Sequence, residues 1–316
     1  LVQQARALAR ANQDFECEAE SLYRLASLAH YDGQPGDAFA IAIEARDFAM
    51  AHDVPLVVAW SLSLIGLVHS NSGNHSEALS CSLQALDCYR GTGHRIDEGN
   101  MLNTIASIYH ELGDTDRAIV NYEAAMNANA QLNRPDFDAI TLANVASLRA
   151  ERGEFDTAIE IGERALALCR MHAVGFLPEV LAALAGAYGG RGEFDQARTL
   201  LNAALAMLDA SSVSFDDAVR SSVELAFGRV ELSAKNDAEA LSHFCRALGL
   251  AEVINAKPIE FSAHCALADL YKAMGQFEEA VYHLEKKFAI NQSIFNEGTD
   301  IRIKTLQVAH EAEESR

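Results

Sequence analysis

The chain has 316 residues, of which 50% are hydrophobic, and it carries a formal net charge of −20 at pH 7. So much negative charge opposes binding to nucleic acids and to anionic lipids, because both require clusters of Lys and Arg against their phosphate groups. The sequence also lacks an apolar run close to the roughly 18 residues of a membrane-spanning helix, so we expect neither a nucleic-acid nor a membrane partner.

A six-residue motif that begins with Gly and ends with Ala recurs along the chain. Consecutive copies lie 39 to 43 residues apart. Repetition at such a period is typical of solenoid proteins, in which one small structural unit is stacked many times. The final alanines of the motif are Ala38, Ala78, Ala118, Ala158, Ala197 and Ala280, with a degenerate copy from Lys235 to Ala240.

Two further small residues keep a constant distance from each motif alanine. One lies twelve positions before it, at Ala26, Gly66, Ala106, Ala146, Ala185, Gly228 and Ala268. The other lies seven positions after it, at Ala45, Ala85, Ala125, Ala165, Ala204 and Ala247, with Lys287 as the exception. Two antiparallel helices approach closely only where the facing side chains are small. The pattern therefore predicts repeated pairs of helices, A and B, with the motif glycine ending helix A through a positive φ angle.

The prolines indicate helix boundaries, because proline is tolerated in the first turn of a helix. Pro55, Pro135, Pro178 and Pro258 are expected at the starts of helices A, and Pro35 in a turn between helices A and B. In chain order we predict helix B of a partial repeat over residues 1–12, then seven helix pairs over residues 16–295. A polar stretch at residues 211–214 is expected to be a loop, and residues 296–316 a capping helix or an outgoing signalling helix.

The register of small residues resembles that of the tetratricopeptide repeat family, with about 40 rather than the usual ~34 residues per repeat. The resemblance implies an all-α fold, a right-handed superhelical solenoid of antiparallel helix pairs. Residues Phe295 to Val308 also resemble the junction between such an array and its output domain in bacterial sensors of the diguanylate cyclase or kinase type. Arrays of this family bind proteins or peptides, which implies the same class of partner here.

Candidate ligand contacts lie on helices A, which line the concave face of such an array, about fifteen, eleven and eight residues before each motif alanine. An amide side chain both donates and accepts hydrogen bonds, so it can hold a peptide backbone. By resemblance to peptide receptors of the family, Asn103 and Asn144 are the leading contacts; the alternative is that these amides satisfy neighbouring helices. The candidate peptide-binding residues are Tyr23, His30, Asn71, Asn103, Ser107, His110, Asn144, Ser147, Arg229 and Asp269.

No catalytic or metal-binding pattern accompanies the repeats. The eleven histidines form no HExxH motif and no cluster with the six cysteines at zinc-ligand spacing. A nucleophile elbow and a phosphate-binding glycine loop are also missing from the sequence. The cysteines are scattered without a CxxC pair, so we interpret them as reduced, mostly buried residues of a cytoplasmic protein. We therefore expect no metal, no cofactor and no enzyme activity.

These features predict a non-catalytic module that binds a protein or peptide. The main hypothesis is that it forms the regulatory or sensor part of a larger bacterial signalling protein. One alternative is a self-associating scaffold that forms a homodimer through its terminal repeats or its C-terminal helix. A second alternative is a stand-alone receptor for a peptide pheromone.

Overall fold

The computed structural model of the protein describes residues 1–72, 74–129, 132, 134–172, 175–210, 216–254 and 256–292. Across these ranges the chain forms helices and turns and no β-strand. Its contacts divide it into two compact units, Leu1–Asn129 and Ala130–Gln292, called unit 1 and unit 2 below. The expected loop at 211–214, the expected C-terminal helix at 296–316 and the motif glycine Gly73 lie outside the described residues.

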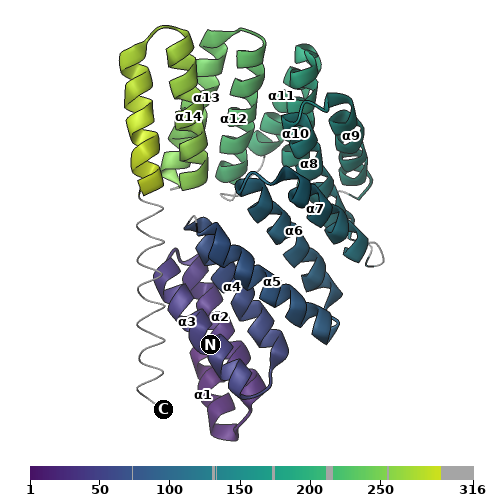
Figure 1. Ribbon diagram of the computed structural model, residues 1–316, viewed down its shortest axis with the longest axis vertical. Helices are drawn as coiled ribbons and strands as arrows, with labels where there is room; N and C mark the ends of the chain where they lie inside the picture. Colours follow the sequence, from purple (N-terminus) through teal and green to yellow (C-terminus); the bar gives the residue numbers. More distant parts are fainter. Residues whose placement is uncertain are drawn as a thin grey trace. The chain divides into compact units, whose positions relative to one another are not determined.

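Unit 1 is a row of helices in which neighbours in sequence run antiparallel and pack against each other (Figure 1). Helix α1 precedes three pairs, α2 with α3, α4 with α5 and α6 with α7. Packing of α3 on α4 and of α5 on α6 joins each pair to the next. The helices are α1 Val2–Asn12, α2 Phe15–Tyr31, α3 Pro35–Ala51, α4 Pro55–Asn71, α5 His75–Thr92, α6 Arg95–Glu111 and α7 Thr115–Asn129.

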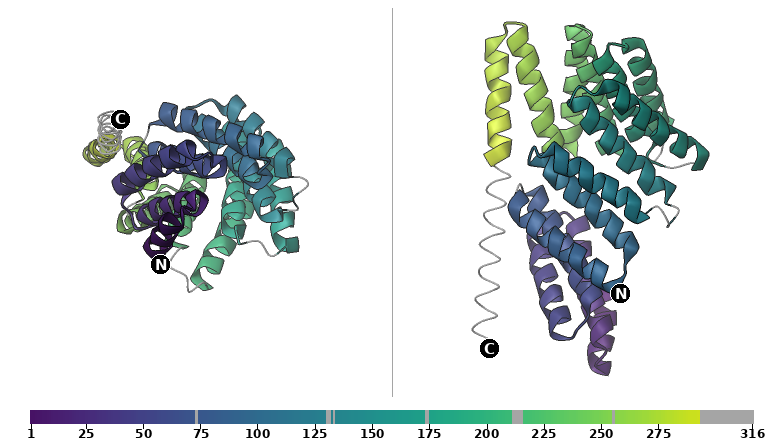
Figure 2. Two further views of the ribbon diagram at one scale, coloured as in Figure 1. Left: turned by 90° about the horizontal axis from the view of Figure 1, so that it is seen from below. Right: turned by 45° about the vertical axis from the view of Figure 1, so that its right-hand side comes forward.

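Within unit 2, neighbouring helices also alternate in direction (Figure 2). Its pairs are α8 with α9, α10 with α11 and α12 with α13, and α14 is followed by a helix over residues 277–292. The helices are α8 Pro135–Glu151, α9 Phe155–His172, α10 Leu177–Arg191, α11 Phe194–Ala210, α12 Asp216–Ser233, α13 Asp237–Val253 and α14 Lys257–Ala273. Both units are therefore all-α and built from consecutive antiparallel pairs, as the small-residue register predicts.

The small residues of the repeat are buried at every position that defines the register. The seven motif alanines are at most 5% exposed, and the alanines seven positions later are fully buried. At Gly66 in α4, an added Cβ would lie 3.1 Å from Ser82 Oγ and 3.3 Å from the Ala78 carbonyl oxygen, both in α5. Helices A and B thus approach so closely that a larger side chain would separate them.

The turn from helix A to helix B is closed by two backbone hydrogen bonds. In the first repeat the Gly33 N–H donates to the His30 carbonyl at 3.1 Å, and the Gln34 N–H donates to the Ala29 carbonyl at 2.9 Å. This arrangement needs a positive φ at the residue after the helix, which glycine adopts without steric cost. The turn glycines Gly33, Gly113, Gly153, Gly192 and Gly275 have φ between 71° and 89°. In the degenerate copy Lys235 takes the same place with φ 62°.

Four of the five prolines begin helices A, as predicted. Pro55 and Pro135 are the first residues of α4 and α8, and Pro178 and Pro258 are the second residues of α10 and α14. The expectation for Pro35 is wrong, because Pro35 is the first residue of α3 and does not lie in the turn before it. At this position a helix has no hydrogen bond to lose from the missing N–H.

Large side chains fill the space above two glycines of unit 2. A Cβ added to Gly228 of α12 would lie 2.4 Å from Cε1 of Phe244, a fully buried ring of α13. A Cβ added to Gly190 of α10 would lie 2.1 Å from Cε1 of Phe155, the first residue of α9. Each glycine thus makes room for one aromatic ring of a neighbouring helix.

Buried polar side chains also connect the helices of unit 2. Glu231 of α12 has a 4% exposed side chain and accepts hydrogen bonds from Arg198 Nε at 2.6 Å and Arg198 Nη2 at 2.9 Å. In α14, His264 Nδ1 lies 2.8 Å from Nδ1 of His283 in the helix over residues 277–292. Both imidazoles are buried, so the two nitrogens share one hydrogen bond in which one ring donates and the other accepts.

Candidate functional site

Unit 2 has a pocket of about 400 Å³ formed by three consecutive helices A, α8, α10 and α12. Its floor consists mainly of small residues, including Ala143, Ala182, Ala183 and Gly186. An added Cβ at Gly186 would meet no atom within 4 Å, so the pocket is open above this residue. A ligand can therefore lie close to the helix backbones here.

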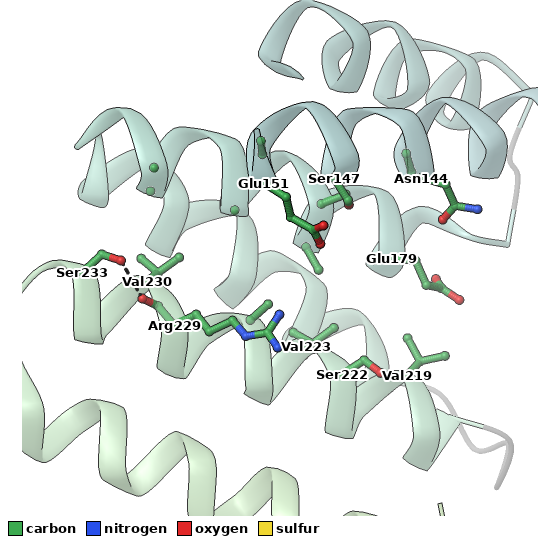
Figure 3. A pocket seen from close by; sticks show the side chains of 18 of the residues that line it. Asn144, Ser147, Glu151, Glu179, Val219, Ser222, Val223, Arg229, Val230 and Ser233 are labelled. Carbon is green, nitrogen blue, oxygen red and sulfur yellow. Dashed lines mark hydrogen bonds between the residues drawn. The ribbon is translucent and has the colours of Figure 1, made fainter. Parts of the chain in front are cut away.

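The rim of this pocket is polar and carries charges of both signs (Figure 3). Asn144 and Ser147 come from α8, and Ser222 comes from α12. The Arg229 side chain of α12 is exposed and extends into the space between the helices, and no described residue forms an ion pair with its guanidinium. Glu151 and Glu179 line the same pocket from α8 and α10. The rim thus offers neutral donors and acceptors together with one cation and two carboxylates.

Unit 1 has a second pocket, of about 270 Å³, lined by α2, α4, α5 and α6. Tyr23, Tyr31 and Tyr89 line it, and so does the Asp97 carboxylate. Trp60 of α4 is not among the lining residues, but it donates a hydrogen bond from Nε1 to Asp97 Oδ2 at 3.3 Å. Its ring also lies against the Tyr23 ring, with centroids 5.5 Å apart.

The hydroxyl groups of this second pocket are ordered by a short chain of hydrogen bonds. Ser63 Oγ donates to the Ala59 carbonyl oxygen at 2.8 Å. The 2.9 Å contact between Ser63 Oγ and the Tyr89 hydroxyl is then donated by Tyr89, because serine has only one hydroxyl proton. Burial raises the pKa of Tyr89 far above its usual value, so this hydroxyl remains neutral.

The structure places five of the ten predicted contact residues in these two pockets. Tyr23 and His30 line the pocket of unit 1, and Asn144, Ser147 and Arg229 line the pocket of unit 2. The other five, Asn71, Asn103, Ser107, His110 and Asp269, line neither of these pockets.

The five remaining candidates differ in exposure. Asn71 and Asp269 are exposed, whereas Asn103 and His110 are half-buried and have interactions of their own. Ser107 is hydrogen-bonded to the Tyr122 hydroxyl. Burial raises the pKa of Tyr122 to about 12, and this hydrogen bond offsets part of the rise. For Ser107 the structure therefore supplies a partner on the neighbouring helix.

The predicted set misses one row of lining residues. Asn100, Ile140, Glu179 and Ser222 each lie eighteen positions before a motif alanine, one helical turn before the predicted positions. The same periodicity extended by one turn would have found all four. Asp97 lies still closer to the start of its helix, beyond the reach of this register.

Burial of the cysteines differs from the sequence-based expectation. All six are free, but only Cys169 is buried, while Cys17 and Cys245 are exposed and the other three are half-buried. Cys17 lies in the first turn of α2, and Cys245 faces outward from α13 beside the buried Phe244. The expectation of mostly buried cysteines is wrong, because neighbouring helices cover Cys81, Cys88 and Cys265 only in part and leave Cys17 and Cys245 exposed.

Two further features concern the described residues as a set. No three His, Cys, Asp or Glu side chains among them are grouped closely enough to hold a metal ion. No helix in the described part of the chain has the length and apolar character to cross a membrane.

Family models of the tetratricopeptide repeat match two parts of the chain, residues 57–171 in two overlapping matches and residues 261–292. The sequence has no match among curated proteins. Several solved structures share the fold at low sequence identity. One is a Rap protein complexed with Competence and Sporulation Factor, with a TM-score of 0.72 and 16% identity over 89% of this chain and 76% of that chain.

Two further structures have a comparable match. Aspartyl phosphate phosphatase F from Bacillus subtilis has a TM-score of 0.69 and 15% identity over 90% of this chain and 74% of that chain. The Rap conjugation gene regulator of the plasmid pLS20, in complex with the Phr* peptide, has a TM-score of 0.67 and 13% identity over 90% and 77% of the two chains. The chain therefore carries tetratricopeptide repeats, and its fold resembles that of the Rap proteins.

Proposed function

We propose that this protein binds an extended peptide in the pocket formed by α8, α10 and α12, and that it acts through this binding rather than by catalysis. The observation that carries the proposal is the convergence of Asn144, Ser147 and Arg229 on one pocket from two helices A. The pocket volume of about 400 Å³ is within the ordinary range for ligand sites, roughly 300–1,000 Å³.

The chemistry of the pocket suits a peptide backbone. The Asn144 amide can donate to a backbone carbonyl and accept from a backbone N–H. Ser147 and Ser222 add hydroxyl groups on opposite sides of the floor of Ala and Gly. Because that floor has few side-chain atoms, an extended chain can approach the helices closely enough to reach these groups. Arg229 and the two glutamates would then select among peptide sequences by charge.

The relatives support a peptide-responsive regulator over the other hypotheses. Two of the similar Rap structures are complexes, one with Competence and Sporulation Factor and one with the Phr* peptide. We therefore favour a receptor for a signalling peptide over the sensor region of a cyclase or kinase.

Selection from a library of phage-displayed random linear peptides, followed by fluorescence anisotropy with the enriched peptides, tests the proposal. The informative variant is Gly186→Leu, which places a side chain in the open part of the pocket. Leucine is a better helix former than glycine, so a loss of binding would not reflect a loss of folding. We expect Gly186→Leu to weaken binding by about tenfold or more, equivalent to ~1.4 kcal/mol.

Gly249→Leu is the matched control. Gly249 is also an exposed helical glycine with no atom within 4 Å of an added Cβ, but it lies in α13 outside the pocket. This variant should bind the selected peptides like the wild type. If no enriched peptide binds saturably, or if Gly186→Leu binds as tightly as Gly249→Leu, the proposal is wrong.

A further inference from the structure

The pocket of unit 1 combines aromatic walls with a carboxylate, which is the chemistry that holds an organic cation. We propose that this pocket binds the guanidinium group of an arginine side chain from a peptide or protein ligand, between Tyr23, Tyr31 and the carboxylate of Asp97. This site is separate from the pocket of α8, α10 and α12, and the inference does not depend on the function proposed for that pocket.

The aromatic walls that would face a guanidinium come from α2. Tyr23 and Tyr31 lie on α2 and line the pocket directly. The indole of Trp60 on α4 packs against Tyr23 with ring planes inclined by 31°. Tyr31 is 81% exposed, so its ring is available to a ligand. A planar guanidinium stacks on such rings and is attracted by the negative charge of their faces.

The carboxylate of Asp97 has no permanent cation beside it. Its described contacts are the Trp60 Nε1 hydrogen bond and His94 Nδ1, 3.4 Å from Oδ2, and histidine is charged only when protonated. No lysine or arginine in the described part of the chain forms an ion pair with Asp97, and none lines the pocket. The Asp97 side chain is 28% exposed, so it remains open to a ligand cation.

The Tyr89 hydroxyl supplies a further acceptor. Because Tyr89 donates its only proton to Ser63, its oxygen lone pairs are left to accept from an N–H group in the pocket. Asp97 is also close enough to Tyr89 to contribute to the raised pKa of that phenol. An arginine that enters between them would donate to both oxygens, which a single ammonium group does less well because it lacks the planar fork.

The size of the pocket indicates one side chain rather than a whole cofactor. A volume of about 270 Å³ is below the usual range for drug-sized ligands. The net charge of −20 attracts a basic ligand and repels an acidic one.

Two synthetic pentapeptides test the inference. One is acetyl-Ala-Ala-Arg-Ala-Ala-amide, and the other replaces arginine by citrulline, which has nearly the same shape without the charge. Trp60 is the single tryptophan of the chain and lies beside Asp97, so its fluorescence reports on this pocket. Isothermal titration calorimetry provides a second, independent reading of the same binding. We expect saturable binding of the arginine peptide, with a preference of about five- to tenfold over citrulline that declines as salt is added.

Asp97→Asn should abolish the preference while keeping an oxygen for the Trp60 hydrogen bond. Asp87→Asn is the matched control, because Asp87 is an exposed residue of α5 outside the pocket and its loss changes the net charge equally. Tyr31→Ala should weaken the arginine peptide without affecting the fold. Equal affinity for the two peptides, an unchanged preference in Asp97→Asn, or no saturable binding by either method would overturn the inference. None of these results bears on peptides that bind at Gly186, so the two proposals can fail separately.

Discussion

Replacement of Gly228 by alanine should destabilise unit 2, although alanine is the better helix former. The added Cβ would lie 2.4 Å from Phe244 Cε1 and 2.5 Å from Cδ1. Ordinary carbon–carbon contacts are about 3.5–4.0 Å, so the ring would have to move by roughly 1 Å. Phe244 cannot move freely, because it is fully buried among residues that include Leu225, Leu267 and Leu270. Overpacking of this kind costs about 1–3 kcal/mol, and full burial places it in the upper part of that range.

The gain in helix propensity offsets part of this cost. Alanine stabilises a helix interior by about 0.8–1.0 kcal/mol relative to glycine. The net effect of Gly228→Ala should therefore be a loss of about 1–2 kcal/mol in the free energy of unfolding. Urea unfolding followed by circular dichroism measures the total, and amide hydrogen exchange shows whether the loss is concentrated in α12 and α13.

Gly186→Ala is the control, because an alanine there meets no atom within 4 Å. It should raise the free energy of unfolding by about 0.5–1 kcal/mol through helix propensity alone. Phe244→Leu in the Gly228→Ala background should recover part of the loss, so the double variant is more stable than the sum of the single changes predicts. If Gly228→Ala stabilises the protein as Gly186→Ala does, the reasoning from the Phe244 contact is refuted.

Two further substitutions and one change of pH should alter the free energy of unfolding in defined directions. Lys235→Gly should stabilise unit 2 by about 1 kcal/mol in urea unfolding, because φ 62° is costly for any residue with a Cβ. Arg198→Met should lower the free energy of unfolding by about 2–3 kcal/mol, because it leaves the Glu231 carboxylate buried without its charged partner. Burial lowers the pKa of both His264 and His283, so the unfolded chain binds more protons than the folded one at low pH. Stability should therefore fall as the pH drops below ~6.5, the usual pKa of histidine.

Each of these outcomes has its own control. Lys235→Ala removes the charge but keeps the Cβ, so it should give none of the gain seen with glycine. Asp195→Asn removes the fully exposed partner of Arg198 and should cost less than about 0.5 kcal/mol. His283→Asn should flatten the decline between pH 7.5 and 5.5, if the histidine pair causes it. An equal cost for Arg198→Met and Asp195→Asn, or an unchanged pH dependence in His283→Asn, would contradict the explanation.

The helix pairs could be predicted from the sequence because their packing restricts side-chain size at fixed positions. Ala26, Ala106 and Ala146 occupy the same place in three repeats, and each is fully buried. Only a residue without a long side chain lets helices A and B approach this closely. The turn glycines were predictable for a related reason, since few other residues adopt a positive φ easily. Lys235 shows that the turn still forms where the glycine is missing, so packing of the two helices is sufficient to hold it.

The pockets were less predictable, because they depend on side chains from several helices. The spacing on helices A identified Tyr23, Asn144 and Arg229 as residues of the inner rows. It could not identify the Tyr122 hydroxyl as the partner of Ser107, since that contact depends on the distance between two helices. The open space above Gly186 could not be predicted either, because periodicity indicates the direction of a side chain but not which atoms lie opposite it.

The fit between Gly190 and the Phe155 ring limits how this protein could be rebuilt by exchange of modules. Gly190 lies in α10, and the ring that packs against it, Phe155, comes from α9 of the preceding repeat. If a repeat is transplanted without its neighbour, these two positions no longer match. An alanine in place of the glycine would clash with the ring, and a side chain smaller than phenylalanine would leave a void. A functional chimaera should therefore keep α9 and α10 together, so that Gly190 is transferred with the Phe155 ring that packs against it.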